Sequence, residues 1–413
     1  MMTKNQINER EQLEILTIEQ LVPANHLVRK LDAAIDFSFI YPLVENLYSQ
    51  FGRPSIDPVV LFKMTMIQYV FGIRSMRQTI KEIETNVAYR WFLGFGFHTE
   101  VPHFSTFGKN YVRRFENTDV FEQIFYRILK EIVEEGLLSA DHIFIDSTHV
   151  KASANKRKFD KKMVRKETRA YEEKLQEELN IDREKNGKKP FPPEKFEKEE
   201  WKEIKESTTD PESGYYVKDE RTKQFAYSFH AATDERGFVL GTIVTPGNIH
   251  DSHILQPLVE KVIEKVKKPL AVAADAAYKT PAITNFLLEN QMLPVLPYTR
   301  PKTKDGFFRK HDYVYDEHND CYICPNDQML PYVTTTKEGY RQFKSNPTIC
   351  ANCPFLKQCT ESKNHTKLIQ RHIWEAYVEE AEHLRHHEEI KLIYAKRKET
   401  IERVFADAKE KHG

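Results

Sequence analysis

Apolar side chains recur at helical spacing through the first third of the chain. Residues 56–95 carry apolar positions three and four residues apart, which predicts two packed helices joined by a tight turn at Gly72. Ser75 is the candidate N-cap of the second helix. Residues 117–136 form a third amphipathic helix in this interpretation, so residues 1–136 are predicted to be an all-helical domain. Its expected buried stripe is Val120, Phe121, Ile124, Phe125, Ile128, Leu129 and Ile132.

The pattern changes after residue 136. Short runs, apolar or alternating and bounded by turn residues, predict strands at 142–150, 225–234, 237–246 and 270–278. Two amphipathic stretches, at 252–266 and 280–291, predict helices. Strands followed by helical crossovers are typical of an α/β layer. Residues 137–413 are therefore predicted to be an α/β domain.

Two stretches interrupt the α/β pattern. Residues 156–206 are rich in Lys and Glu, poor in apolar residues and broken by Pro192 and Pro193, which predicts a solvated, partly helical insertion. Residues 300–370 hold all five cysteines and are predicted to be a second, Cys-rich insertion.

The composition excludes two classes of protein. The chain has no run of 18 apolar residues, so we expect no membrane span and no membrane partner. The N-terminus lacks the apolar segment of a secretory signal, so we expect the chain to stay in the reducing cytoplasm without a disulfide scaffold.

The formal net charge is zero, with 62 basic against 62 acidic residues, but the charge is segregated along the chain. Residues 53–114 carry nine bases against four acids, whereas residues 9–50 carry seven acids against three bases. Aromatic residues are interleaved with the bases of the first stretch, which suits contact with nucleic-acid phosphates. A solvated charged face is the alternative. The candidate DNA-binding residues are Arg74, Arg77, Arg113 and Arg114.

The cysteines form two C-x2-C pairs, Cys321 with Cys324 and Cys350 with Cys353, followed by Cys359. In a reducing compartment such pairs predict a structural zinc site, because each pair supplies two thiolates from one turn to a tetrahedral ion. Five thiols compete for four positions, with His365 as a weaker competitor. Free thiols are the alternative.

Three carboxylates stand out at the ends of predicted elements. Asp146 ends the apolar run IFID, and Asp275 ends AVAAD. Strand-end capping is the alternative for either residue alone, since Asp is depleted in strands. Glu402 borders the apolar stripe of a C-terminal helix, where solvated surface is the alternative. Together the three could converge on magnesium, and two such ions clamp the attacking and leaving oxygens of a phosphodiester.

His250 and Asp251 form a further polar pair. Asp251 or Ser252 is expected to cap the helix that follows, and a catalytic pair is the alternative.

Most of the chain resembles bacterial insertion-sequence transposases of the DDE type, and most closely the insertion sequence 1182 group. The resemblance lies in the ordered segments 23–40, 52–94, 102–115, 144–158, 208–234, 244–258, 273–282 and 397–413. It implies a ribonuclease H-like α/β core, a mixed sheet flanked by helices, behind the all-α N-terminal domain.

The resemblance also implies roles for individual residues. The three metal-binding acids of the family fall on Asp146 in FIDST, Asp275 in AADAAY and Glu402 in TIERVF, with Mg²⁺ or Mn²⁺ as the cofactor. Lys409 matches the family's lysine. Arg397 has the expected spacing from Tyr394 but lies one residue too far from Glu402, so Lys398 is the alternative phosphate-contacting base. The zinc ligands implied by the resemblance are Cys324, Cys350, Cys353 and Cys359, with Cys321 as the alternative.

The implied function is transposition. The protein would act as a homodimer on double-stranded DNA in the bacterial nucleoid, cut at the ends of its element and join the freed 3'-hydroxyl strand to target DNA by two-metal phosphoryl transfer. Similar transposases continue past the His412–Gly413 dipeptide, so an inactive, truncated DNA-binding protein is one alternative. A hydrolytic nuclease on the same core is the other.

Overall fold

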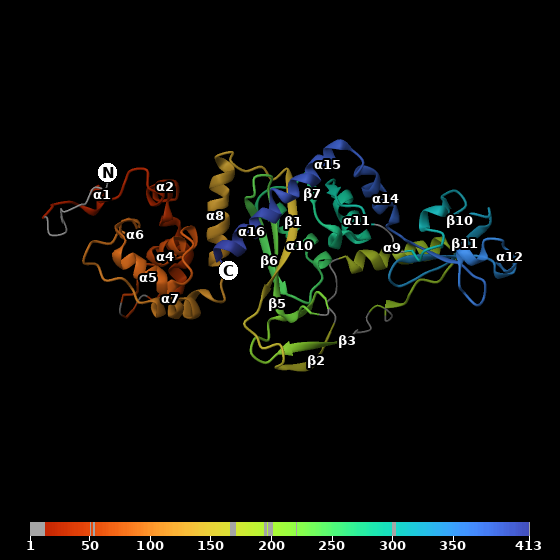
Figure 1. Ribbon diagram of the computed structural model, residues 1–413, viewed down its shortest axis with the longest axis horizontal. Coiled ribbons are helices and arrows are strands. Elements are labelled where there is room, and N and C mark those ends of the chain that lie inside the picture. The colour runs from red at the N-terminus through yellow and green to blue at the C-terminus, as the bar shows by residue number, and fades with distance from the viewer. Residues whose placement is uncertain are drawn as a thin grey trace, which may run out of the picture. The chain divides into compact units, whose positions relative to one another are not determined.

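The computed structural model describes residues 13–49, 51–52, 54–165, 171–193, 196, 201–219, 221–299 and 303–412. The chain divides into two compact units, Met1–Leu137 with Ala406–Gly413 and Leu138–Phe405 (Figure 1). Arg53 and parts of the two predicted insertions lie outside the described residues. Within the described ranges, no helix is both long and apolar enough to span a bilayer.

Every regular element described in the N-terminal unit before residue 137 is helical, which confirms the predicted class of this region. Asp57 caps the fourth helix, whose first turn holds Pro58, and Ser75 caps the fifth. Gly72, between them, has a positive φ of 63°. The elements are α1 (Ile18–Leu21), α2 (Leu27–Ala34), η1 (Phe37–Phe39), α3 (Ile40–Val44), η2 (Glu45–Leu47), α4 (Pro58–Val70), α5 (Met76–Thr85), α6 (Val87–Phe92), α7 (Phe104–Asn110), η3 (Tyr111–Phe115) and α8 (Val120–Glu134).

Two predictions for this unit were wrong in detail. Residues 56–95 hold three helices, because the side chain of Asn86 accepts hydrogen bonds from the N–H groups of Ala88 and Tyr89 and so starts α6. The predicted stripe of α8 is only partly buried. Phe121 and Phe125 remain 36% and 37% exposed, although the Phe121 ring lies 5.2 Å from that of Phe62.

The second unit is built on a mixed eight-stranded sheet. Its order is β2-β3-β4-β5-β1-β7-β8, with β6 also paired to β5. β1 is antiparallel to β5 and parallel to β7, and β7 is parallel to β8. The strands are β1 (His142–Lys151), β2 (Phe159–Arg165), β3 (Trp201–Ser207), β4 (Gly214–Val217), β5 (Lys223–Thr233), β6 (Val239–Pro246), β7 (Ala271–Ala273) and β8 (Leu293–Val295).

Helices from the later part of the chain pack on the main sheet. Phe144 and Ala273 of the sheet share one apolar core with Ile393, Ile401 and Phe405, which fixes the C-terminal helices beside β1 and β7. The helices of this unit are α9 (Glu172–Lys185), η5 (Asp251–His253), α10 (Leu255–Lys265), η6 (Ala276–Tyr278), α11 (Pro281–Glu289), α14 (Glu375–Leu384), α15 (Glu388–Ala395), η8 (Lys396–Lys398) and α16 (Ile401–His412), the last of which continues into the other unit.

The charged stretch 156–206 contributes strands that its composition did not predict. β2 and β3 pair in antiparallel register and extend the main sheet. Cross-strand ion pairs join Lys161 to Glu203 at 3.0 Å and Lys162 to Glu206 at 2.9 Å. Opposite charges on neighbouring strands add to the stability of a sheet. The predicted helical part is α9.

The segment that contains the cysteines forms a second, five-stranded antiparallel sheet of order β13-β12-β11-β10-β9, with Cys321 on β10 and Cys350 and Cys359 on the short helices between β12 and β13. Its small core is mainly aromatic and contains Tyr313, Tyr322, Leu330, Phe343 and Ile369. The elements are η7 (Lys310–Asp312), β9 (Val314–Asp316), β10 (Cys321–Ile323), β11 (Met329–Thr335), β12 (Tyr340–Lys344), α12 (Pro347–Ala351), α13 (Leu356–Cys359) and β13 (Leu368–His372).

Helix α9 joins the two sheets, as its course toward β11 shows (Figure 1). Arg183 of α9 donates to the carbonyl oxygen of Thr335 at 2.8 Å. At the other end of the helix, Leu175 packs with Trp374, whose indole N–H donates to Glu178 at 2.6 Å. Trp374 is 1% exposed.

Replacing Trp374 by Ala should therefore destabilise the second unit. The loss of a buried aromatic side chain costs about 3–5 kcal/mol, and Glu178 also loses its hydrogen-bond donor. Thermal and urea unfolding of Trp374→Ala and Trp201→Ala provide the comparison, because Trp201 is 54% exposed on β3. We expect a large loss of stability for the first and a small one for the second. Equal effects would contradict the packing of α9 against Trp374.

Candidate active site

The parallel pairing of β1 with β7 brings Asp146 and Asp275 to the same level. Phe144 of β1 pairs with Ala273 of β7, and each aspartate lies two residues beyond its strand's paired residue. Side chains alternate along a strand, so residues two beyond a parallel pair point to the same face. Asp146 therefore lies within β1, at the point where its neighbour β7 has ended, and Asp275 lies in the segment that leaves the carboxyl end of β7. Open α/β sheets commonly bind ligands at such strand ends.

Asp146 is the most constrained of the three acids. One oxygen accepts a hydrogen bond from the N–H of Ser147 at 2.8 Å, and the other accepts one from Arg397 at 2.9 Å. Burial raises the pKa of Asp146, and the negative charges of Asp275 and Glu402 raise it further, against the opposing effects of Arg397 and the Ser147 N–H. The charges of Asp275 and Glu402 therefore both act on the carboxylate of Asp146.

Glu402 lies in the first turn of α16, between two anchors. Ile401 and Phe405 on either side are buried in the core that contains Phe144 and Ala273. Glu402 itself is exposed. This arrangement leaves its carboxylate free on the solvent side of α16 while the helix is held against the strands that carry Asp146 and Asp275. A carboxylate in a first helical turn is also stabilised by the helix dipole.

A break in the helix places Arg397, and not Lys398, beside Asp146. The chain leaves α15 at Ala395, passes through the 3-10 turn η8 and starts α16 at Ile401. Arg397 is buried and donates to Asp146, whereas Lys398 is exposed. The extra residue between Arg397 and Glu402 is absorbed at this break, so the angular offset expected for a continuous helix does not apply.

The side chain of Arg397 is held from several directions. Its guanidinium lies 5.6 Å from the centre of the Tyr394 ring, and a second nitrogen donates to the Tyr394 hydroxyl at 3.4 Å. The preceding Lys396 forms an ion pair with Glu235 at 2.7 Å, and Glu235 also contacts the ring of His142 on β1. Nε of Arg397 is buried and has no hydrogen-bond partner.

A second layer of polar groups lies beside Asp146. Tyr278 is fully buried, and its hydroxyl is 3.4 Å from Nδ1 of His230, whose Nε2 contacts the Thr245 hydroxyl at 3.1 Å. Burial lowers the pKa of His230 to about 4, although Asp251, 3.8 Å away, opposes the shift. Burial, followed by the charges of Asp251 and Asp146, raises the pKa of Tyr278. At neutral pH the layer is therefore a neutral imidazole and a protonated phenol.

The sequence interpretation missed Tyr278 and His230. The signals that could have found them are the tyrosine three residues after Asp275 and a histidine within the alternating run of β5. The capping prediction was also wrong. Nδ1 of His250 accepts from the Ser252 N–H and caps η5, so Asp251 is left to face His230.

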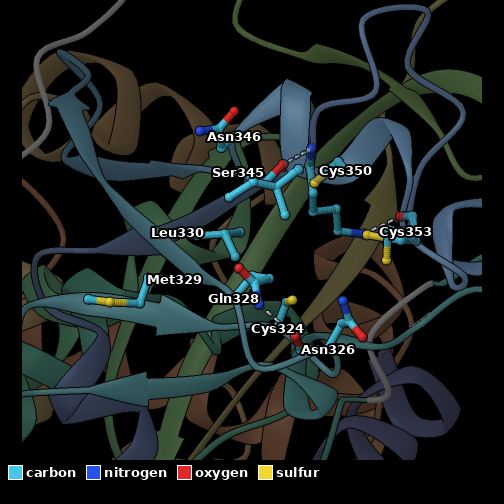
Figure 2. Close-up of a pocket in the computed structure, with 12 residues that line it drawn as sticks. Cys324, Asn326, Gln328, Met329, Leu330, Ser345, Asn346, Cys350 and Cys353 are labelled. Atoms are coloured by element: carbon cyan, nitrogen blue, oxygen red, sulfur yellow. Dashed lines mark hydrogen bonds between the residues drawn. The ribbon is translucent and has the colours of Figure 1, made fainter.

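The predicted cysteine ligands separate into two groups. Cys324, Cys350, Cys353 and Cys359 line one small cavity, shown in Figure 2, whereas Cys321 is buried at the start of β10 and does not line it. In the described part of the chain, no three His, Cys, Asp or Glu side chains are arranged to hold a metal ion.

The candidate DNA-binding arginines lie on the N-terminal unit. Arg74, Arg77 and Arg113 are exposed, and the Arg77 guanidinium lies 4.4 Å from the centre of the Phe104 ring. Arg114 is half-buried over the Tyr48 ring and donates to Asn110. Another base of the same stretch has a structural role, because Arg90 is buried and donates to backbone carbonyl oxygens.

Two family models match the chain. One, described as "Transposase domain (DUF772)", matches residues 16–113, and the other, described as "Transposase DDE domain", matches residues 323–413. The chain is thus similar to transposase domains, one of them of the DDE type, over two segments that together make up less than half of its length. The second match contains Arg397 and Glu402, whereas Asp146 and Asp275 lie outside both matches. No curated protein and no solved structure matches the chain.

The repulsion among the acids can be measured through its effect on the free energy of unfolding in metal-free buffer. The pKa of Asp146 is raised, so the stability it contributes is fully present below the ordinary pKa of an aspartate and is lost as the pH rises through the raised value. Asp275→Asn removes one charge that raises this pKa and keeps an acceptor for the Ala277 N–H. We expect the variant to be up to about 1 kcal/mol more stable than wild type at neutral pH, and no more stable near pH 4.

Asp141 provides the control of opposite sign. Hydrogen bonds from Lys267 and Ser139 lower the pKa of Asp141, so its carboxylate contributes stability above the ordinary pKa and loses it as the pH falls. Asp141→Asn should therefore lose stability at neutral pH. Urea unfolding of both variants with EDTA tests the pair. If Asp275→Asn were destabilised at neutral pH as Asp141→Asn is, the acids would not repel one another.

Proposed function

We propose that this protein binds the ends of its insertion element and cuts and joins DNA by two-metal phosphoryl transfer, with Asp146, Asp275 and Glu402 as the metal ligands. The observation that carries the proposal is the matched register of Asp146 and Asp275, together with the influence of Asp275 and Glu402 on the pKa of Asp146. The narrower assignment to the insertion sequence 1182 group stays a prediction.

The donor set fits Mg²⁺ or Mn²⁺. Hard divalent cations prefer carboxylate oxygens, and a cation between these acids would relieve the repulsion that raises the pKa of Asp146. When bound, such a pair of ions activates the attacking oxygen and stabilises the leaving oxygen of a phosphodiester. Asp146 would hold an ion from β1 and Asp275 from the segment after β7, and Glu402 would close the site from α16.

Arg397 supplies a positive charge that can move from Asp146 to a phosphate oxygen of the DNA. Its guanidinium is bonded to Asp146, so an ion bound by Asp146 would free the guanidinium for a phosphate oxygen. Arginine binds phosphate well because its donors form a planar fork. Tyr394 and the Lys396–Glu235 ion pair would keep this side chain at the site. Lys409, exposed on α16, is proposed as a further contact to the DNA backbone.

The neutral layer behind the acids has a positioning role in this mechanism. Neutral His230 and protonated Tyr278 add no charge to a site that already carries three carboxylates. His230 lies on β5 opposite Ser147 of β1, and Tyr278 lies in η6 directly after Asp275, so the two would hold the acid-bearing segments rigid as charge is transferred.

The N-terminal unit is proposed to bind the terminal repeats. Its exposed Arg74, Arg77 and Arg113, with Arg114, would contact phosphates, which position a protein on DNA without reading its sequence. Two ends must be processed together, so we propose a homodimer on DNA. We also retain the prediction of a nucleoid-associated protein.

Cleavage and strand transfer on duplexes that carry the element's ends test the proposal. With Mg²⁺, wild type should cut the end and join it to target DNA. Asp146→Asn, Asp275→Asn and Glu402→Gln should fall to the level seen with EDTA, because each removes a charged ligand. Asp160→Asn is the matched control, an exposed aspartate on β2, and should keep wild-type activity.

The same assay separates the competing functions. DNA binding without metal-dependent cleavage by wild type would identify an inactive DNA-binding protein. Cleavage without joining would identify a hydrolytic nuclease. Wild-type activity in Asp146→Asn would contradict the proposed site.

A further inference from the structure

We propose that four bases at the end of β1 and in the loop after it bind the backbone of the DNA duplex whose phosphodiester reaches Asp146. These loop bases are Lys151, Lys156, Arg157 and Lys158. The inference rests on the proposed function, because it adds a contact surface for the same DNA. This surface is separate from the candidate DNA-binding arginines, which belong to the other unit.

The loop bases lie further along the strand that carries Asp146. β1 continues for five residues from Asp146 to Lys151, a length of about 17 Å at about 3.3 Å per residue. Five base pairs of duplex DNA rise by the same length, at about 3.4 Å per pair. A duplex that follows β1 with one phosphate at Asp146 therefore brings phosphates about five base pairs away to Lys151.

The loop connects the two ends of one row of paired residues. This row runs from Lys151 of β1 across β5, β4 and β3 to Asp160 of β2. Its four strand spacings of about 4.8 Å give a width of about 19 Å. Beyond the row the sheet continues as β2 and β3 (Figure 1). The loop bases are thus spread over the length of several phosphates instead of being gathered at one point.

Backbone hydrogen bonds hold the loop in place. At its start, Ala152 is buried and its N–H donates to a carbonyl of β5 at 3.0 Å. At its end, the Lys158 carbonyl accepts at 3.3 Å from the residue that follows β3. Between these anchors, the Asn155 side chain accepts from the Arg157 N–H at 3.0 Å and forms a turn. Because the loop is already ordered, DNA binding has to immobilise only its side chains.

The loop bases lack acidic partners. All four are exposed, and within the ranges that the structure describes none of them forms an ion pair. By contrast, Lys161 and Lys162 of β2 pair with Glu203 and Glu206. Residues 151–165 carry seven bases and one acid. Uncompensated positive charge of this kind suits the phosphates of DNA, which release counterions when bases bind them.

The surface between Asp146 and the loop is open. Side chains alternate along a strand, so Thr148 and Val150 point to the same face as Asp146. Thr148 is half-buried and Val150 is 46% exposed. No acidic side chain of β1 lies between Asp146 and Lys151. A phosphate backbone can therefore follow β1 from the acids to the loop bases without meeting a like charge on this strand.

The salt dependence of DNA binding tests this surface. Fluorescence anisotropy of a duplex that carries the element's end, measured in EDTA, gives the slope of log Kd against log salt concentration without cleavage. The triple variant Lys156→Gln, Arg157→Gln and Lys158→Gln should reduce the magnitude of this slope by about 2–3, since each lost phosphate contact removes about 0.9. Replacing Lys156 and Lys158 by Arg keeps their charge and should retain the wild-type slope.

A second triple variant controls for net charge. Lys185→Gln, Lys188→Gln and Lys189→Gln remove three exposed bases from the end of α9 and the segment after it. This variant should keep the wild-type slope. Thermal unfolding of both triple variants should match wild type, because the substituted side chains are exposed.

Neutral methylphosphonate linkages locate the contact on the DNA. Placed about five base pairs to one side of the cleavage position, and then to the other, they should weaken binding by wild type on one side only. The loop variant should not respond to them there, because the bases that contact those phosphates are already gone.

Three results would overturn the inference: an unchanged salt slope in the loop variant, an equal loss of slope in the α9 variant, or equal effects of every neutral linkage on wild type and loop variant. Asp146-dependent cleavage with an unchanged slope in the loop variant would sink this inference alone. The predicted slopes and linkage effects without cleavage by wild type would contradict the proposed function and leave the binding surface standing.

Discussion

The backbone pairing between β1 and β7 is the constraint on which the candidate site depends. Because His142, Ile143 and Phe144 pair in parallel with Ala271, Val272 and Ala273, Asp146, further along β1, is level with the segment that leaves β7 and carries Asp275. The pairing is buried, since Phe144 and Ala273 are fully covered by the C-terminal helices. The same apolar core thus contains residues of β1, of β7 and of the helix that carries the third acid.

Placing these carboxylates near one another costs electrostatic free energy, and a purely structural role for the acids would not explain that cost. Asp146 is only 20% exposed at its side chain and feels two like charges. One buried guanidinium offsets part of that cost, and its own Nε has no hydrogen-bond partner. Groups that reduce stability in this way are common where a cation or a charged substrate completes a site. Lys396, Glu235 and His142 then act by keeping the arginine and β1 in place.

Much of the fold could be predicted because apolar periodicity reports burial directly. The helices around Gly72 and the runs that end in Asp146 and Asp275 are of this kind. The β2–β3 ribbon could not be predicted, because pairs such as Lys161–Glu203 stabilise it only after the strands have met. A charged sequence without apolar alternation gives no sign of that pairing.

The site was predictable as a set of residue types but not as a geometry. No pattern in the sequence reveals that Phe144 pairs with Ala273, and the break between η8 and α16 has no proline or glycine to mark it. For that reason the choice between Arg397 and Lys398 stayed open. His230 and Tyr278 lie in runs whose apolar neighbours conceal them, and only their burial beside Asp146 makes them notable.

The most direct test of the central claim, that the three acids converge, is the position of a bound ion. Crystals of the full-length protein grown with Mn²⁺ would show it in an anomalous difference map. We predict a peak between the carboxylates of Asp146 and Asp275, with Glu402 turned toward it and Arg397 released from Asp146. An empty map at these residues at saturating Mn²⁺, or an ion bound elsewhere with the Asp146–Arg397 pair intact, would contradict the claim.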